Sequence, residues 1–360
     1  ALPCAPIGGN EEDGFCVDED LLSDIARLVG QPLPDLLAHT VQTMARARSR
    51  HVAKMFIYGC LSGDERLIGS LEGPFHDRAR FSRQWLTQTI GDLFPELTLR
   101  PLQTGDRDNY NPISASLWLA EGRDGSKVVV KENLRLPVDY SRLDGYSAEG
   151  EMLDFLDLSG VVRLDRIARA ADHELLVLQF VEGEPLSRYC SPETLLPRKE
   201  VAQLGAQLAQ TLAALHDRGV LYLDVKAKNV LWDGRRTTLV DFGMAQRGTD
   251  KASSLLSTPA FVPPEMVLNF QATAAADVFQ LGLLLFLLFT GRHPFATTGF
   301  RTGDAYRESE LLRYGLANLY EEPRLDLLAH HEPLLRSMLQ RDPRLRPSVN
   351  LVAQQLRGEP

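Results

Sequence analysis

The stretch LYLDVKAKNVLWDGRRTTLVDFG, residues 221–243, places two acids, an amide and a lysine in two short turns beside apolar runs. Asp224, Lys226 and Asn229 lie in the first turn, and Asp241 lies in the second. An Asp-Gly pair between the apolar runs is typical of a β-hairpin. Such a hairpin would hold the amide and the last aspartate at neighbouring strand ends, where both can bind a hard cation such as Mg²⁺. The first aspartate then remains available to face a hydroxyl nucleophile.

The same stretch resembles the catalytic loop and the metal-binding loop of eukaryotic-type protein kinases. The family patterns H-R-D-L-K-x-x-N and D-F-G are matched by Y-L-D-V-K-A-K-N and D-F-G. The resemblance implies that Asp224 takes the proton of the acceptor hydroxyl and that Lys226 offsets charge on the transferred phosphoryl group. It also implies that Asn229 and Asp241 bind Mg²⁺.

Three further catalytic positions follow from the resemblance. Lys131 ends a predicted strand, VVVK, as the lysine of the family pattern V-A-I-K does, and would bind the α- and β-phosphates of ATP. Glu149, in the next predicted helix, is the expected partner of this lysine, with Glu151 as the alternative. Downstream, Thr258 fits the serine/threonine kinases, whose matching residue bonds the catalytic aspartate and lysine.

The resemblance also implies a nucleotide pocket. The residues expected around the adenine lie in or beside predicted strands, and they are Val129, Leu178, Gln179, Val181 and Leu231. The loop that covers the phosphates in the family is rich in glycine, because backbone amides must approach them closely. Here NYNPISASLWL contains no glycine, so Ser114 and Ser116 are expected to substitute with small side chains.

The chain departs from the family pattern at two positions of the first loop, and it retains two later motifs that imply a long-range ion pair. Leu223 replaces the arginine that binds a phosphorylated activation loop in the family, which disfavours that mode of switching. Tyr222 replaces a histidine and is expected to pack under Phe242. The segments STPAFVPPEM and RDPRLRPS resemble later family motifs, which imply a buried ion pair between Glu265 and Arg346.

An α+β, two-lobed protein-kinase-like fold is therefore expected over residues 99–357. A small β-rich N-lobe would occupy about 99–180, and a larger helical C-lobe about 184–357. Residues 1–20 are rich in Pro, Gly and acids and are expected to be flexible. Residues 21–98 are expected to form a helical N-terminal region.

Local patterns predict several elements directly. Apolar runs joined by a Gly-containing turn predict strands at 116–120 and 128–131. Helical periodicity predicts helices over 79–93 and over 198–217, the second amphipathic. The run LGLLLFLLF, residues 281–289, is about half the length that crosses a bilayer, so a buried helix is expected.

Composition limits the classes of function. The net charge of −9 and pI near 5.5 disfavour nucleic acid as a partner. The cysteines show no C-x-x-C spacing and are expected to be free thiols; they are Cys4, Cys16, Cys60 and Cys190. No signal peptide is visible, although the chain begins at Ala1, which suggests a removed or omitted upstream segment.

The expected function is ATP- and Mg-dependent transfer of the γ-phosphoryl group to Ser/Thr hydroxyls of protein substrates. Two alternatives stay open: a pseudokinase or nucleotide-binding scaffold, and a small-molecule kinase of the aminoglycoside or choline type. A regulatory partner is expected for the helical N-terminal region, and no membrane span. Composition rich in Ala, Leu and Arg favours a bacterial source, with a place in the bacterial cytosol, or in a host cytosol for a delivered effector.

Overall fold

A computed structural model describes most of the segment that carries the motifs. The described residues are 95, 97–101, 117–134, 145–170, 173–248, 259–269, 271–295, 318, 322–328 and 331–358. Several predictions lie outside them: the flexible region 1–20, nearly all of the helical region 21–98 with its helix 79–93, and the site residues Ser114, Ser116 and Thr258.

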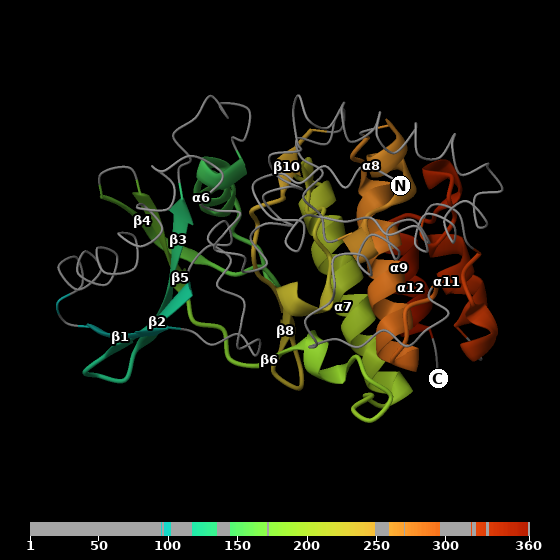
Figure 1. Ribbon diagram of the computed structural model, residues 1–360, viewed down its shortest axis with the longest axis horizontal. Helices are drawn as coiled ribbons and strands as arrows, with labels where there is room; N and C mark the ends of the chain where they lie inside the picture. The colour runs from blue at the N-terminus through green and yellow to red at the C-terminus, as the bar shows by residue number, and fades with distance from the viewer. Residues whose placement is uncertain are drawn as a thin grey trace, which may run out of the picture. The chain divides into compact units, whose positions relative to one another are not determined.

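The chain divides into two compact units (Figure 1). The first comprises Ala1–Leu136 and Leu164–Phe180, and the second comprises Pro137–Arg163 and Val181–Pro360. The helix that carries Glu149 therefore groups with the second unit, although it lies between two strands of the first unit in the sequence.

An antiparallel five-stranded sheet in the order β1-β2-β3-β5-β4 forms the described part of the first unit. Its strands are β1 (Leu97–Pro101), β2 (Leu117–Gly122), β3 (Lys127–Leu134), β4 (Leu164–Ala170) and β5 (His173–Gln179). The β2–β3 hairpin confirms the strands predicted at 116–120 and 128–131, and the observed strands extend further. One face of the sheet packs an apolar cluster of Trp118, Ala120, Val130, Leu175 and Val177.

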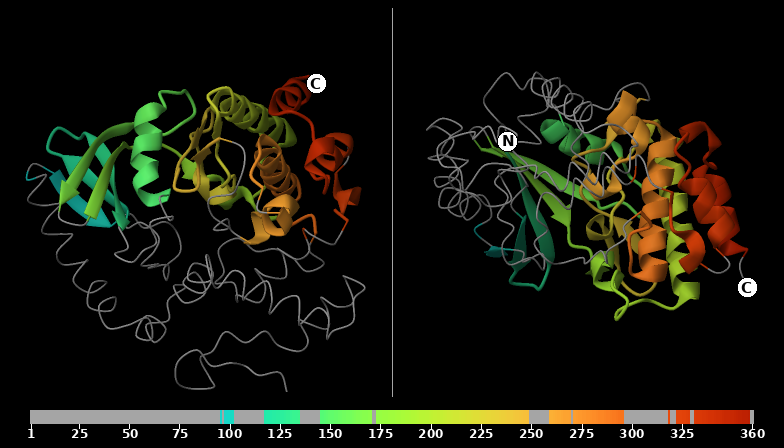
Figure 2. Two further views of the ribbon diagram at one scale, coloured as in Figure 1. Left: turned by 90° about the horizontal axis from the view of Figure 1, so that it is seen from above. Right: turned by 45° about the vertical axis from the view of Figure 1, so that its right-hand side comes forward.

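The largest described elements of the second unit are helices. They are α6 (Gly145–Phe155), α7 (Arg198–His216), α8 (Pro264–Asn269), α9 (Ala274–Thr290), α11 (Glu332–Met338) and α12 (Val349–Arg357). Helix α7 confirms the amphipathic prediction, with its apolar residues buried. Helix α9 is buried on every side along most of its length, as LGLLLFLLF predicts. It packs against α7 and α11, while α7 also packs against α12, so the four helices form one bundle (Figures 1 and 2).

Helix α9 ends where the chain turns sharply. Gly291 has φ 67°, the left-handed conformation that favours glycine at a helix C-terminus. A Cβ atom at this position would lie 2.5 Å from the backbone nitrogen of Pro192, so a larger residue would also clash. In the part of the chain that the structure describes, no helix has both the length and the apolar character needed to span a bilayer.

Short elements connect the helices of the second unit. The strands are β6 (Glu184–Pro185), β7 (Val220–Leu221), β8 (Val230–Trp232), β9 (Thr237–Leu239) and β10 (Gln246–Arg247). The 3₁₀ turns are η1 (Leu186–Tyr189), η2 (Ala227–Asn229), η3 (Pro259–Phe261), η4 (Leu325–Leu327) and η5 (Pro343–Leu345). Strands β6, β8 and β9 form one small antiparallel sheet, and β10 pairs with β7. The pairing of β8 with β9 confirms the hairpin predicted on either side of Asp-Gly.

A buried ion pair ties helix α8 to the segment between α11 and α12. Arg346 Nη1 lies 2.6 Å from Glu265 Oε1, and Nη2 lies 2.8 Å from Oε2. The side chains are 0% and 2% exposed. This two-bond geometry confirms the predicted pair and is the strongest form of an Arg–carboxylate contact.

Candidate active site

Asp224 lies in the loop between β7 and η2, and its two carboxylate oxygens differ. Oδ2 accepts hydrogen bonds from Lys226 Nζ at 2.9 Å and from Asn229 Nδ2 at 2.7 Å. Oδ1 is buried and accepts no hydrogen bond from any residue that the structure describes. A buried acceptor left unpaired costs free energy. A hydrogen bond from an external donor, such as a hydroxyl group, would therefore stabilise this carboxylate most at Oδ1.

The surroundings of Asp224 make its carboxylate a stronger base. Burial raises the pKa of this carboxyl above its ordinary value of 3.8. The positive charge of Lys226 opposes the rise, and the negative charge of Asp241 adds to it. Burial dominates, and a higher pKa favours proton acceptance from an attacking hydroxyl.

The hairpin brings the two predicted metal ligands to adjacent strand ends. Val230 pairs with Leu239, and the next residue along, Val240, donates its N–H to the carbonyl of Asn229 at 2.9 Å. Asp241 follows at once with φ 65°, a left-handed conformation that redirects the chain after the strand. This arrangement confirms the predicted neighbourhood of the amide and the carboxylate.

The oxygen ligands at these strand ends fit Mg²⁺, which needs few protein ligands, better than a metal that is bound by protein side chains alone. Across the described residues, no group of three or more His, Cys, Asp and Glu side chains is placed to hold a metal ion. Asn229 and Asp241 offer one amide oxygen and one carboxylate. Mg²⁺ commonly binds through one or two carboxylates and completes its shell with waters and substrate phosphates.

Glu149 on α6 contacts the loop that follows Asp241 directly. Its Oε1 accepts the backbone N–H of Phe242 at 3.1 Å, and the residue is 1% exposed. Glu151, the alternative, is exposed to solvent. Burial and the bond to the loop therefore favour Glu149. Its expected pairing with Lys131 would join two separately described units and stays a prediction.

The first unit brings three predicted nucleotide residues to one face of its sheet. Val129 and Lys131 are two residues apart on β3, so their side chains point to the same side, opposite Val130 of the apolar cluster. Leu178 on β5 is the cross-strand partner of Val129. Lys131 is 7% exposed, although it carries a charge. Such deep burial of a lysine is unusual and is consistent with a role beyond the surface.

The remaining predicted adenine contacts are divided between the units. Gln179 ends β5 in the first unit and is exposed. Val181 and Leu231 belong to the second unit and are half-buried. Their joint contact with a nucleotide stays a prediction.

The aromatic pair behind the loops matches its prediction. Tyr222 and Phe242 pack edge to face with ring centroids 5.0 Å apart. Tyr222 donates its hydroxyl hydrogen to the carbonyl of Val240 at 2.5 Å. Burial raises the pKa of this phenol well above its ordinary value, so it stays a neutral donor. The tyrosine thus links the catalytic loop to the strand that leads into Asp241.

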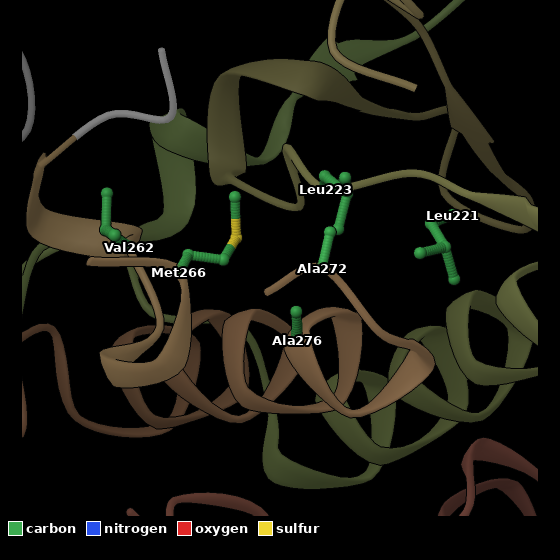
Figure 3. Packing of buried hydrophobic residues seen from close by; sticks show 6 residues of the cluster. All are labelled: Leu221, Leu223, Val262, Met266, Ala272 and Ala276. Carbon is green, nitrogen blue, oxygen red and sulfur yellow. The ribbon is translucent and has the colours of Figure 1, made fainter. Parts of the chain in front are cut away.

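Leu223 is held in an unfavourable backbone conformation inside an apolar cluster. Its φ is 61°, which is rare for a branched residue. Figure 3 shows its side chain directed to Ala272 and Ala276, and Leu221, Val262 and Met266 complete the cluster. These apolar neighbours accommodate a leucine side chain, whereas a guanidinium placed among them would lose its hydration.

The backbone of the loop is fixed by a side chain that belongs to α9. Asp277 accepts the N–H groups of Tyr222 at 3.0 Å and of Leu223 at 2.6 Å. It also bonds His216 Nε2 at 2.8 Å. The segment ADVFQLGLLLFLLFTGRHPF resembles the buried helix that follows the activation segment in the family, and this resemblance indicates Asp277 as the aspartate of that helix. It did not reveal Gln280, one turn further along α9, whose amide contacts the same loop. A polar residue inside the run of apolar α9 residues was the only signal available.

Comparison with known proteins agrees with this geometry. The sequence matches the protein kinase domain family over residues 118–357. It is 32% identical over 210 residues to the serine/threonine-protein kinase pkn2 of Myxococcus xanthus, covering 55% of this chain and 24% of that protein. It is 29% identical over 228 residues to the serine/threonine-protein kinase ULK3 of Homo sapiens, covering 62% of this chain and 46% of that protein.

A further bacterial relative, the serine/threonine-protein kinase PkaA of Streptomyces coelicolor, is 33% identical over 185 residues, covering 48% of this chain and 34% of that protein. The chain thus spans less than half the length of these curated relatives. The family match covers two thirds of the chain and includes both loops of the site. The chain therefore belongs to the protein kinase domain family, among its eukaryotic-like serine/threonine members.

Proposed function

We propose that this protein transfers the γ-phosphoryl group of ATP to Ser or Thr hydroxyls of protein substrates. The supporting observation is the asymmetry of Asp224, whose Oδ2 is held by two donors while the buried Oδ1 has no donor among the described residues. A carboxylate held in this way has one oxygen fixed by hydrogen bonds, while its other oxygen has bonding capacity that no described residue uses. That is what a group needs in order to receive a proton from an incoming hydroxyl.

Phosphoryl transfer requires the protein to position the reactants and to compensate their charge, and it requires little covalent chemistry from the protein. Asp224 Oδ1 would orient the acceptor hydroxyl and take its proton. Lys226, held against the same carboxylate, would offset charge on the transferred group. Lys131, fixed by Glu149, would position the α- and β-phosphates.

Protein kinases generally use ATP and Mg²⁺, and the residues here fit both. Asn229 and Asp241 would hold the cation, which when bound neutralises phosphate charge. The protein substrate is proposed from the same family membership, together with the Glu265–Arg346 ion pair that anchors helix α8. The acceptor is proposed to be aliphatic because the lysine two residues after Asp224 follows the serine/threonine pattern.

The first test uses binding. Thermal unfolding of the protein is followed with ATP alone, with Mg²⁺ alone and with both, and Asp241→Asn is compared with Asp233→Asn. Asp233 lies in the β8–β9 turn, where its Oδ1 accepts two backbone N–H groups, so it is a matched aspartate away from the metal loop. Stabilisation by ATP is expected to depend on Mg²⁺ in the unsubstituted protein and in Asp233→Asn, and to be lost in Asp241→Asn.

The second test uses transfer. Labelled ATP is supplied with a mixture of generic proteins or with an extract of small metabolites, and labelled protein is hydrolysed to identify the phosphorylated residue type. Phosphoserine or phosphothreonine supports the proposal. Label on metabolites alone would favour a small-molecule kinase, and Mg-dependent ATP binding without transfer would favour a scaffold.

A further inference from the structure

Gln280 is a polar side chain at the centre of the apolar helix α9. It is 0% exposed, and its neighbours along the helix from Leu281 to Phe289 are apolar or glycine. A buried amide must find partners for both its oxygen and its nitrogen. Gln280 finds them outside its own helix: Oε1 accepts the backbone N–H of Val225 at 3.0 Å, and Nε2 donates to the carbonyl of Leu223 at 2.9 Å.

These two partners belong to the two peptide groups that flank Asp224. The carbonyl of Leu223 is part of the peptide unit before Asp224, and the N–H of Val225 is part of the unit after it. Peptide units are planar, so anchoring both leaves little freedom in the two backbone dihedrals of the residue between them. The direction in which the aspartate side chain leaves the backbone is fixed in consequence.

The role differs from that of Asp277, one turn earlier on the same helix. Asp277 accepts the N–H groups of Tyr222 and Leu223, and so holds the approach to the loop. Residues i and i+3 lie on one face of a helix, so α9 presents a carboxylate and an amide side by side to consecutive backbone groups. Of these two side chains, only Gln280 bonds the peptide groups on both sides of Asp224.

Strain in the loop explains why such an anchor is needed. Leu223 adopts φ 61°, a left-handed conformation that is unfavourable for a residue other than glycine. A strained conformation persists only where its surroundings over-determine it. Here the apolar cluster holds the Leu223 side chain (Figure 3), and Asp277 and Gln280 form hydrogen bonds with its N–H and its carbonyl.

We infer that Gln280 is a positioning residue for phosphoryl transfer: it acts through the peptide groups on both sides of Asp224 and aims the carboxylate at the acceptor hydroxyl. Gln280 itself contacts neither substrate nor nucleotide in this role. The inference rests on the proposed function, because it assigns Asp224 as the group that receives the proton.

The test replaces Gln280 by an apolar residue of similar length, Gln280→Met. The matched control is Gln207→Met on α7. Gln207 is half-buried and makes the same two-bond bridge in the β8–β9 turn: Nε2 donates to the carbonyl of Arg235 at 2.8 Å, and Oε1 accepts the N–H of Thr237 at 3.0 Å. Both substitutions remove a glutamine that bridges two backbone groups, but only one of the bridges spans Asp224.

For each variant, kcat, the KM for ATP and for a peptide substrate, the unfolding midpoint and the hydrogen-exchange rates of the loop amides are measured. Gln280→Met is expected to lower kcat by about 10- to 100-fold, because small displacements of a reacting group have effects of this size. The KM for ATP is expected to stay within about twofold. Exchange at the amide of Val225 is expected to accelerate. Gln207→Met is expected to leave kcat and the Val225 amide unchanged.

If Gln280→Met does not fold, Gln280→Asn is used with the same criteria, since the shorter amide cannot reach both peptide groups. A kcat within about twofold of the unsubstituted protein would overturn the inference, as would an equal fall of kcat in Gln207→Met. An unsubstituted protein that transfers no phosphoryl group would refute the proposed function instead. The exchange data then decide the inference alone: unchanged exchange at the Val225 amide in Gln280→Met would refute the anchor.

Discussion

Asp224 and Glu265 are two carboxylates of the second unit that are almost equally buried, at 4% and 3% exposure, yet they are bonded very differently. Both oxygens of Glu265 accept hydrogen bonds from one guanidinium, that of Arg346. The other N–H groups of that arginine donate to the carbonyls of Gln340, Ala275 and Arg341. Asp224 has two donors on one oxygen and none among the described residues on the other.

The comparison separates a structural carboxylate from a candidate catalytic one. Burial alone does not distinguish them, and neither does charge. A buried polar group that serves only the fold is expected to have all of its bonding capacity used, because each unpaired atom costs free energy. The buried Oδ1 of Asp224, which has no donor among the described residues, departs from this expectation, as the proposed role in proton transfer would require.

Of the substitutions that test this contrast between Asp224 and Glu265, Asp224→Asn should have the largest effect. Transfer is expected to fall by about 10³-fold or more, since an amide cannot accept the hydroxyl proton. Nucleotide affinity should change little. Because burial raises the pKa of Asp224, its ionised form costs the folded state stability at neutral pH, so the neutral amide should leave the free energy of unfolding unchanged or higher. Kinetics and urea unfolding check both parts, with Asp233→Asn as the control; substantial turnover would show that the base is misassigned.

Arg346→Met should show the opposite pattern. Removing one partner of a buried ion pair leaves Glu265 uncompensated, and a loss of about 3 to 5 kcal/mol in the free energy of unfolding is expected. Transfer per folded molecule should be retained at low temperature. Arg344→Met is the matched control, because its partner Asp342 lies at the surface and the Arg344 side chain is 87% exposed. A loss of stability no larger than that of the control would contradict the structural role of the buried pair.

His293→Gln tests a buried ionisable group that is fully bonded in its neutral form. Nε2 donates to the carbonyl of Ala260 at 2.9 Å, and Nδ1 accepts the N–H of Phe295 at 3.3 Å. Burial lowers the pKa of His293 from 6.5 to about 4. The unfolded chain therefore takes up the proton first, and stability should fall by about 2 kcal/mol between about pH 7.5 and pH 5.

In His293→Gln this contribution to the pH dependence should disappear. Urea unfolding of both proteins at the two pH values measures the difference. An equal pH dependence in the two proteins would show that the proton taken up on unfolding is not that of this histidine.

Lys226→Met should produce the smallest and most specific effect, a shift in the pH profile of kcat. The positive charge of Lys226 lowers the pKa of Asp224, so its removal should raise that pKa further. The acid limb of the profile is then expected to move to higher pH, apart from any fall in the plateau. An acid limb that stays in place would indicate that a group other than Asp224 sets it.

Much of the site could be predicted from sequence because its determinants are local. The Asp-Gly turn between two apolar runs predicts the hairpin, and the hairpin alone brings Asn229 beside Asp241. Alternation on β3 predicts that Val129 and Lys131 share a face. The motif order predicts the ion pair of Glu265 with Arg346. In each case neighbouring residues or a family pattern carry the information.

Tertiary structure alone decided which polar atoms meet across long separations. Glu149 reaches the amide of Phe242 from 93 residues away, and Gln280 spans Leu223 and Val225 from more than 50. No local pattern specifies such contacts, because they depend on how buried helices pack once the chain has collapsed. The same packing raises the pKa of Asp224, since desolvation exists only in the folded state, and it leaves the buried Oδ1 without a donor among the described residues. The sequence by itself indicated which residues are candidates for the chemistry, and the packing around α9 decided the backbone geometry at Asp224.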